Sequence, residues 1–255
     1  MPQPRRWQLI PVGALALLMG LGARVQAAPP ETAPAELTAA LEDIETAANA
    51  QDLDAVMAFY DAAFVNEDGF TYETFETALA ELWERYDTLT YRIELQSWEE
   101  TPNGYVAETV TYIDGTMSEP RTALLESVMR SRQTYEDGQI VSQEILSERN
   151  QLNSGSNPPT VTVILPERVT PDETYEFDAI VQEPIGNSYL LGVAIDEGTT
   201  AEDFFTARPI DLELLAAGGL FKLGDAPTDE DNLWVSGLLI RDDGLVVVTR
   251  RLRVE

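Results

Sequence analysis

The fold is first indicated by residues 89–113, which read LTYRIELQSWEETPNGYVAETVTYI. Tyr91, Ile93 and Leu95 alternate with charged or amide side chains, and this period of two is typical of a β-strand with one buried face. Turn-forming residues follow at 101–104, and a second strand-like run begins after them. The stretch therefore predicts two antiparallel strands that share an apolar face.

Three helices are predicted upstream of this stretch. An apolar stripe of helical period begins at Leu37, and residues 72–86 show the same spacing. Between them, Asp52 is a candidate N-cap for a second helix, whose apolar face would carry Tyr60 and Phe64.

Turn signals complete the first half. An Asp-Gly pair at 68–69 marks a small hairpin before the third helix, and another at 137–138 joins strand-like runs at 123–135 and 139–148. Three helices, a small hairpin and four antiparallel strands predict an α+β cone, in which a curved sheet wraps around the helices.

The second half of the chain has strand-like patterns throughout. Seven short runs separated by turn formers predict an all-β, antiparallel sandwich of immunoglobulin-like architecture. These runs are 161–165, 174–181, 189–196, 210–215, 220–223, 234–241 and 245–254.

Composition divides the chain into five segments. Residues 1–27 are predicted to be a signal peptide and 28–34 a disordered tail. Residues 35–151 form the predicted α+β domain, 152–159 a polar linker that ends in two prolines, and 160–255 the β-sandwich domain.

The first 27 residues have the order of a secretory signal. Arg5 and Arg6 precede an apolar run, and Val25 and Ala27 supply small residues at the −3 and −1 positions of a cleavage site. An uncleaved anchor is the alternative. Removal of this segment and its three arginines would change the formal charge from −29 to −32. We therefore expect an exported protein, either periplasmic or extracellular.

Composition also excludes several classes of function. The chain has no cysteine and no histidine, which rules out thiolate nucleophiles, disulfides, a Ser-His-Asp triad and histidine-bound metal. Lys222 is its single lysine, so Schiff-base chemistry is not expected. With 45 acidic against 16 basic residues, neither nucleic acid nor, after signal cleavage, an anionic membrane is an expected partner.

Several local stretches resemble exported members of the nuclear-transport-factor-2-like superfamily, which includes SnoaL-like and ketosteroid-isomerase-like domains. These are 52–60, the hairpin 68–72, and 130–135 before 137–140, and the resemblance covers about residues 35–150. It implies a cone that encloses a pocket. Isomerases of the superfamily use a carboxylate base with tyrosine-type oxyanion donors, and its dehydratases use His/Asp pairs, which this chain lacks.

Strand alternation and this resemblance together suggest a polar pocket. Glu108 and Tyr112 would share a face of one strand, and a Glu108–Arg130–Glu144 cluster would cross the sheet. A surface ladder of cross-strand ion pairs is the alternative interpretation. The candidate pocket residues are Tyr60, Trp98, Glu108, Tyr112, Glu126, Arg130 and Glu144; no catalytic residue is assigned.

A metal site has one candidate loop. Asp225, Asp229 and Asp231 lie in an acidic segment that could offer carboxylate oxygens to calcium, and a solvated acidic loop is the alternative. No metal is assigned, and no cofactor is expected.

Three functions remain open at this point. The first is an exported, non-enzymatic binding or protein-interaction protein, whose partner is a small hydrophobic ligand or another protein. The second is an isomerase or hydrolyase that uses a buried carboxylate with tyrosine donors. The third is a structural dimerisation module that forms a homodimer through the α+β domain.

Overall fold

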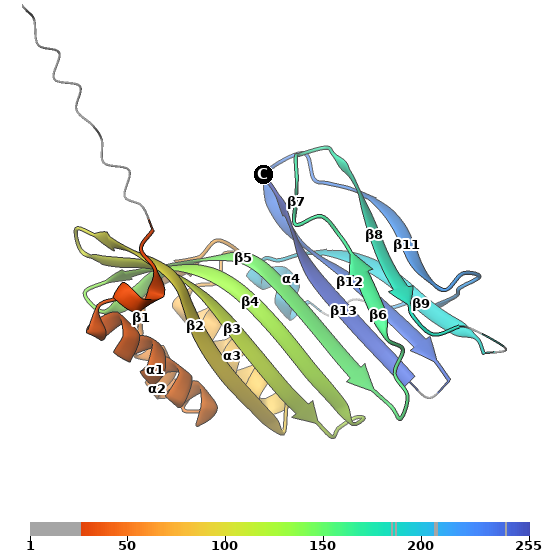
Figure 1. Ribbon diagram of the computed structural model, residues 1–255, viewed down its shortest axis with the longest axis horizontal. Helices are drawn as coiled ribbons and strands as arrows, with labels where there is room; N and C mark the ends of the chain where they lie inside the picture. The colour runs from red at the N-terminus through yellow and green to blue at the C-terminus, as the bar shows by residue number, and fades with distance from the viewer. Residues whose placement is uncertain (1–26, 185, 187, 207–208, 243) are drawn as a thin grey trace, which may run out of the picture.

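The computed structural model describes residues 27–184, 186, 188–206, 209–242 and 244–255, and shows a mostly β protein with few helices (Figure 1). The expected signal peptide lies almost wholly outside these residues. In the first half the elements are η1 (Pro30–Thr32), α1 (Ala35–Asn49), α2 (Leu53–Met57), β1 (Tyr60–Asn66), α3 (Tyr72–Arg85), β2 (Thr88–Thr101), β3 (Gly104–Met117), β4 (Ala123–Glu136) and β5 (Gln139–Ser154). In the second half they are β6 (Val161–Ile164), β7 (Arg168–Val169), β8 (Thr174–Val181), β9 (Leu190–Gly198), α4 (Ala201–Phe205), β10 (Glu213–Leu214), β11 (Gly219–Asp225), β12 (Asp231–Arg241) and β13 (Gly244–Val254).

One large sheet runs through both halves of the chain. Its strand order is β10-β9-β12-β13-β5-β4-β3-β2, and β1 and β7 pair in parallel with β5 and β13. A second sheet of order β11-β8-β6 packs on one face of the large sheet, and α3 and α4 lie behind the opposite face in Figure 1. The fold is therefore consistent with the α+β class, with a large antiparallel sheet as its main component.

Strand β5 joins the two halves and corrects the expected linker. Leu152 and its two successors pair with β4 on one side and with β13 on the other, so the predicted spacer 152–159 begins as three residues of strand. The run of Asn and Gln that suggested a linker is compatible with a strand because these side chains are only partly buried.

The prediction of the second helix is correct for Leu53–Met57 and wrong from Tyr60 onward. Asp52 does cap α2, its side chain accepting from the Ala55 N–H at 3.0 Å, but Tyr60 and Phe64 belong to β1. A spacing of four residues fits both a helical stripe and one face of a strand, and pairing of β1 with β5 decides for the strand. The predicted hairpin is limited to a bridge between Val65 and Thr71.

The free edge of β2 is covered by the residues expected to form a disordered tail and by α1. Ala28 forms two backbone hydrogen bonds with Trp98, at 2.7 and 3.1 Å, and η1 follows it. The Asn49 side chain both donates to Tyr91 O (2.9 Å) and accepts from Tyr91 N (2.8 Å), as a neighbouring strand would. Covering an edge in this way removes a site of unwanted strand pairing.

Two apolar cores lie on opposite faces of the large sheet. The first fills the space between the helices and β2–β5, with Phe64, Met57 and Ile140 among its most buried members. The second lies between the large sheet and β8, where Phe177 meets Val248 and neighbouring residues. The predicted strand 174–181 is confirmed with its bounds, whereas β7 and α4 were not predicted.

Replacing Asn49 tests the covered edge. We expect Asn49→Ala to lower the free energy of unfolding by about 1–3 kcal/mol, because it leaves the Tyr91 N–H and C=O without their partner. Urea unfolding followed by circular dichroism measures this change. Asn103→Ala, at the exposed β2–β3 turn, is the matched control, and an equal loss in both variants would contradict the role assigned to Asn49.

Candidate functional site

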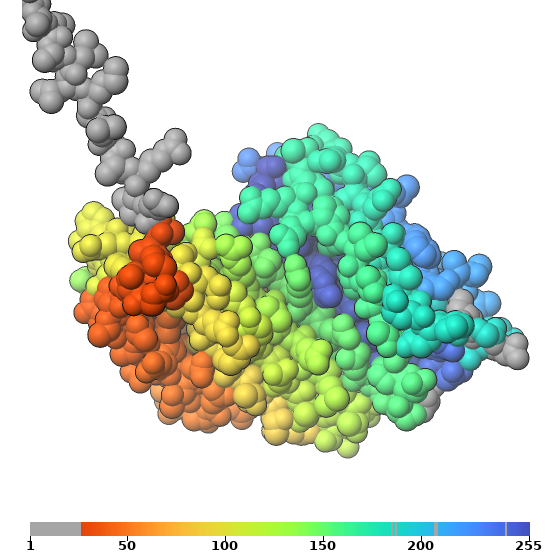
Figure 2. Space-filling view, in the orientation of Figure 1, coloured from red at the N-terminus to blue at the C-terminus, as the bar shows by residue number. Residues whose placement is uncertain are grey.

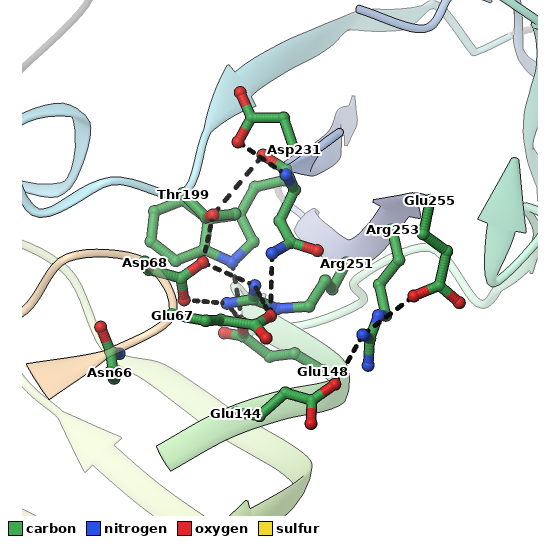
Figure 3. A network of polar contacts seen from close by, with 12 residues as sticks. Asn66, Glu67, Asp68, Glu144, Glu148, Thr199, Asp231, Arg251, Arg253 and Glu255 are labelled. Atoms are coloured by element: carbon green, nitrogen blue, oxygen red, sulfur yellow. Dashed lines mark hydrogen bonds and ion pairs between the residues drawn. The ribbon is translucent and has the colours of Figure 1, made fainter. Parts of the chain in front are cut away.

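A buried ion pair lies where the two halves of the chain meet. Asp68, in the loop after β1, receives two hydrogen bonds from Arg251 of β13, at 2.9 and 2.7 Å. The two side chains are only 3% and 1% exposed, and they face each other in Figure 3. A bidentate contact of this kind is the strong form of a carboxylate–guanidinium interaction.

Strand pairing explains the position of this contact. β1 pairs with β5 as far as Gln143, and β13 pairs with the same edge of β5 from Ser154 back to Arg149. The two strands approach each other head-on, which leaves residues 144–148 of that edge without a strand partner. Asp68 and Arg251 fill this interval.

Further polar groups complete the cluster. Thr199 donates to Asp68 at 2.5 Å, so both carboxylate oxygens are occupied. Glu148 lies 3.6 Å from Arg251 and accepts hydrogen bonds from Trp234 and Asn150, at 2.8 and 2.7 Å. Both carboxylate oxygens of Asp68 and both of Glu148 therefore accept hydrogen bonds from the protein itself. We call this group of residues the clamp, because its contacts hold the two halves of the chain together.

Glu67 is the most exposed carboxylate of this cluster. Partial burial raises its pKa, as do the neighbouring Asp68 and Glu144, while Arg253 and Arg251 oppose the rise. Its carboxylate accepts from Asn232 Nδ2 at 2.8 Å, which links the loop to β12.

Three of the predicted pocket residues form a ladder of ion pairs. Arg130 and Arg132 both donate to Glu108 at 2.7 Å, and Arg132 continues to Glu144 at 2.8 Å. Glu144 also pairs with Arg253 of β13 at 2.6 Å. The expected Glu108–Arg130–Glu144 cluster is therefore joined through Arg132, which sequence reasoning missed.

The ladder shifts the pKa of Glu108. Burial tends to raise it, but hydrogen bonds from Arg130 and Arg132 outweigh burial and hold the pKa below its ordinary value. Both arginines are about half exposed, with side-chain exposures of 50% and 44%. The arrangement matches the alternative interpretation of a surface ladder.

The other predicted pocket residues are not brought together. Tyr60 lies in the first core against Phe75, with ring centroids 4.9 Å apart, and burial raises its pKa. Trp98 donates to Thr32 at 3.2 Å. Tyr112 is covered by the Arg92 guanidinium at 3.8 Å, and Glu126 is exposed.

The acidic loop does not form a metal centre. Asp225 accepts from the Thr174 hydroxyl at 3.0 Å, and Asp231 accepts from the Asn232 N–H at 2.7 Å. Over the part of the chain that the structure describes, no group of three or more acidic side chains is arranged to hold a metal ion. In the same residues, no helix is long and apolar enough to cross a bilayer.

Buried carboxylates are scarce in the part of the chain that the structure describes. Of the carboxylates in the described residues, Asp68 alone is buried, and it is paired with Arg251 and not with a tyrosine. The inward polar groups are instead hydroxyls and amides, such as Thr109 and Ser131, whose side chains lie 3.2 Å apart.

A partly exposed apolar surface lies on the face that α3 and α4 share. Cross-strand register places Val193, Leu238, Val247 and Leu152 in one row over β9, β12, β13 and β5. These side chains belong to neither core. We call the whole surface the apolar platform; it comprises Leu152, Leu191, Val193, Ile195, Leu214, Leu238, Ile240, Leu245 and Val247.

The Asp68–Arg251 contact and the platform were missed because their residues are distant in the chain. Asp68 was seen only as part of a turn signal, and Arg251 is 183 residues away. The alternation of apolar residues in 189–196 and 234–241 was visible, but it could not show which face would stay open.

Removal of Asp68 tests the clamp. We expect Asp68→Ala to lower the free energy of unfolding by about 3 kcal/mol, because Arg251 is left buried without its main partner. The double variant Asp68→Leu/Arg251→Met should recover part of this loss, since the two most buried charges of the cluster are then both absent. Chemical denaturation measures all three proteins.

The matched control is Glu94→Gln, which breaks an exposed pair with Arg92 and should cost less than about 1 kcal/mol. A double variant no more stable than Asp68→Ala would show that the charge left behind is not the cause.

Acid sensitivity tests the ladder. The pKa of folded Glu108 is lower than its ordinary value of 4.5, so Glu108 contributes stability above that pH and loses it as the pH falls through the folded value. We expect Glu108→Gln to be less stable than the native chain at pH 7, by at most about 1 kcal/mol. The difference should shrink below pH 4.5, and a difference constant over pH 3–7 in thermal unfolding would contradict this assignment.

Comparisons with known proteins give limited matches. Residues 156–255 match the model of a domain of unknown function, DUF8623, and no curated protein matches. A Bdellovibrio bacteriovorus protein, Bd1075, is 16% identical with a TM-score of 0.32, over 43% of this chain and 38% of that one. An M. tuberculosis LEH-like epoxide hydrolase is 17% identical with a TM-score of 0.32, over 43% of this chain and 80% of that one. The chain thus spans well under half of the Bdellovibrio protein, and its second half is similar to a family without a described activity.

Proposed function

We propose that this chain is a non-enzymatic interaction protein that binds a partner on the apolar platform. The observation that carries the proposal is the row Val193–Leu238–Val247–Leu152, a strip of apolar side chains that crosses four strands outside both cores. Contiguous apolar surface of this kind marks interaction sites in soluble proteins. A strip that spans four strands suits a macromolecular partner better than a small enclosed ligand.

Charge defines the chemistry of the proposed partner. The chain carries a formal charge of −29, and part of it lies in the segments that border the platform, as the exposed carboxylates of Glu202, Asp211, Glu213 and Asp242. A second copy of the chain would bring the same negative charge. We therefore infer that the occupant is a basic, amphipathic segment of another protein, whose apolar side meets the platform and whose cations meet its border.

The proposal includes the domain interpretation and the location. We take the first half as a nuclear-transport-factor-2-like cone and the second as an immunoglobulin-like sandwich, which share one sheet. In an exported chain, this shared sheet would present the platform to partners outside the cytoplasm. The catalytic alternative has less support, because the buried carboxylate of Asp68 is committed to Arg251.

A model peptide tests the platform. The probe is a labelled 18-residue helix of leucine and lysine with one apolar face, and its control has the same composition in scrambled order. We expect Leu238→Ser to weaken binding of the amphipathic peptide by about 10-fold, because the contact of one leucine side chain is lost. Fluorescence anisotropy at physiological salt measures the affinity.

The matched control is Leu223→Ser, which removes an exposed leucine (70%) from β11, outside the platform, and should leave the affinity unchanged. The proposal would be contradicted if the scrambled peptide bound as tightly as the amphipathic one, because the interaction would then be general charge attraction. It would also be contradicted if Leu238→Ser and Leu223→Ser bound the amphipathic peptide with the same affinity. Sedimentation of the free chain as a dimer that Leu238→Ser dissociates would assign the platform to a second copy instead.

A further inference from the structure

A second surface feature lies on the opposite face of the large sheet. It is a pocket of about 210 Å³ between β5, the segment that joins β6 to β7, and the C-terminal part of β13. In Figure 2 the blue atoms of β13 are visible at the floor of a groove between green and teal segments. The pocket is lined by Ser147, Glu148, Arg149, Val163, Leu165, Pro166, Glu167, Arg250 and Arg251.

Two arginines on adjacent strands share this pocket. Arg250 of β13 is directly opposite Arg149 of β5, so their side chains are neighbours on one face of the sheet. Like charges in this position repel each other, and the contact costs stability unless a negative charge lies nearby.

Arg250 has no carboxylate partner among the described residues. One terminal nitrogen of its guanidinium donates to the carbonyls of Asn150 and Thr249, at 3.1 and 2.8 Å. Burial, together with the charge of Arg149, lowers its pKa. A partly buried guanidinium that only carbonyl groups compensate is unusual in a chain with 45 acidic residues.

Arg149 stands at the mouth of the pocket. It pairs with Glu167 at 3.0 Å, and the two side chains are 61% and 68% exposed. An exposed pair of this kind contributes little stability, so its arginine can exchange Glu167 for another anion at low cost.

We propose that this pocket binds the carboxylate of a small organic acid between Arg250 and Arg149. Val163, Leu165 and Pro166 would contact the apolar part of the acid. Glu167, which pairs with Arg149, also lines the pocket, and its charge favours an anion with one negative charge over phosphate or sulfate. The site is independent of the platform, which lies on the other face of the sheet.

Benzoate is the probe, and isothermal titration calorimetry measures its binding to the purified protein. We expect saturable binding of benzoate and none of benzamide, which has the same shape without the charge. Arg250→Gln should weaken benzoate binding by at least about 10-fold, because a hydrogen-bonded charge is lost. Arg149→Gln should weaken it by about 5-fold, and Arg92→Gln, on the far side of β3, should leave it unchanged.

Several outcomes would overturn the proposal. These are no saturable binding of benzoate, equal binding of benzamide, tighter binding of phosphate or sulfate than of benzoate, or unchanged affinity in Arg149→Gln. Should Arg250→Gln fail to fold, as judged by circular dichroism, Arg149→Gln decides alone, because Arg149 is exposed and its loss is not expected to unfold the chain.

Discussion

The contact between Asp68 and Arg251 determines how the two halves of this protein form one structure. Strands β1 and β13 compete for the same edge of β5 and meet head-on, so neither can pair with residues 144–148. Two buried charges are costly alone, and here a bidentate geometry, together with the Thr199 hydroxyl, offsets that cost. Because its partners come from the loop after β1 and from the last strand, the contact fixes the relative position of segments 183 residues apart.

Because one sheet continues through both halves of the chain, binding surfaces can lie outside the space between the helices and the sheet. In an isolated cone, the interior between helices and sheet is the natural place for a pocket, but here that space holds the first core. The same sheet face continues from Leu125 through Leu152 to Val247, and beyond the helices it becomes the platform. The opposite face is covered by β8 and its neighbours, and the Arg250 pocket lies at the border of that cover. Each proposed site thus lies at a border on the large sheet. The platform begins where the helices no longer cover one face, and the Arg250 pocket lies where β8 and its neighbours no longer cover the other.

Local sequence patterns predicted the elements well, and failures occurred where tertiary contacts decided. Helix α1 and strand β8 were readable because the period of their apolar residues matches a single type of element. Tyr60 and Phe64 fit two periods, and only pairing with β5 makes them a strand. The first three residues of the predicted linker proved to be strand, because Asn and Gln favour loops in isolation whereas β5 has strand partners on both sides there. The candidate site was predicted only in part: Glu108, Arg130 and Glu144 do lie together, as a surface ladder and not as a pocket.

In this acidic chain, several arginines lie where carboxylates from different strands come close together. Arg132, Arg251 and Arg253 each contact more than one carboxylate and join strands of the large sheet, so the few cations hold regions where acidic strands converge. Arg250 differs from them, because its register neighbour is Arg149 and its hydrogen-bond acceptors are carbonyl groups. Carboxylates are not scarce in this chain, with 45 acidic residues against 16 basic ones. The lack of a carboxylate beside Arg250 within the described residues is therefore a matter of position, because strand register places Arg149 where the ladder has Glu108 and Glu144.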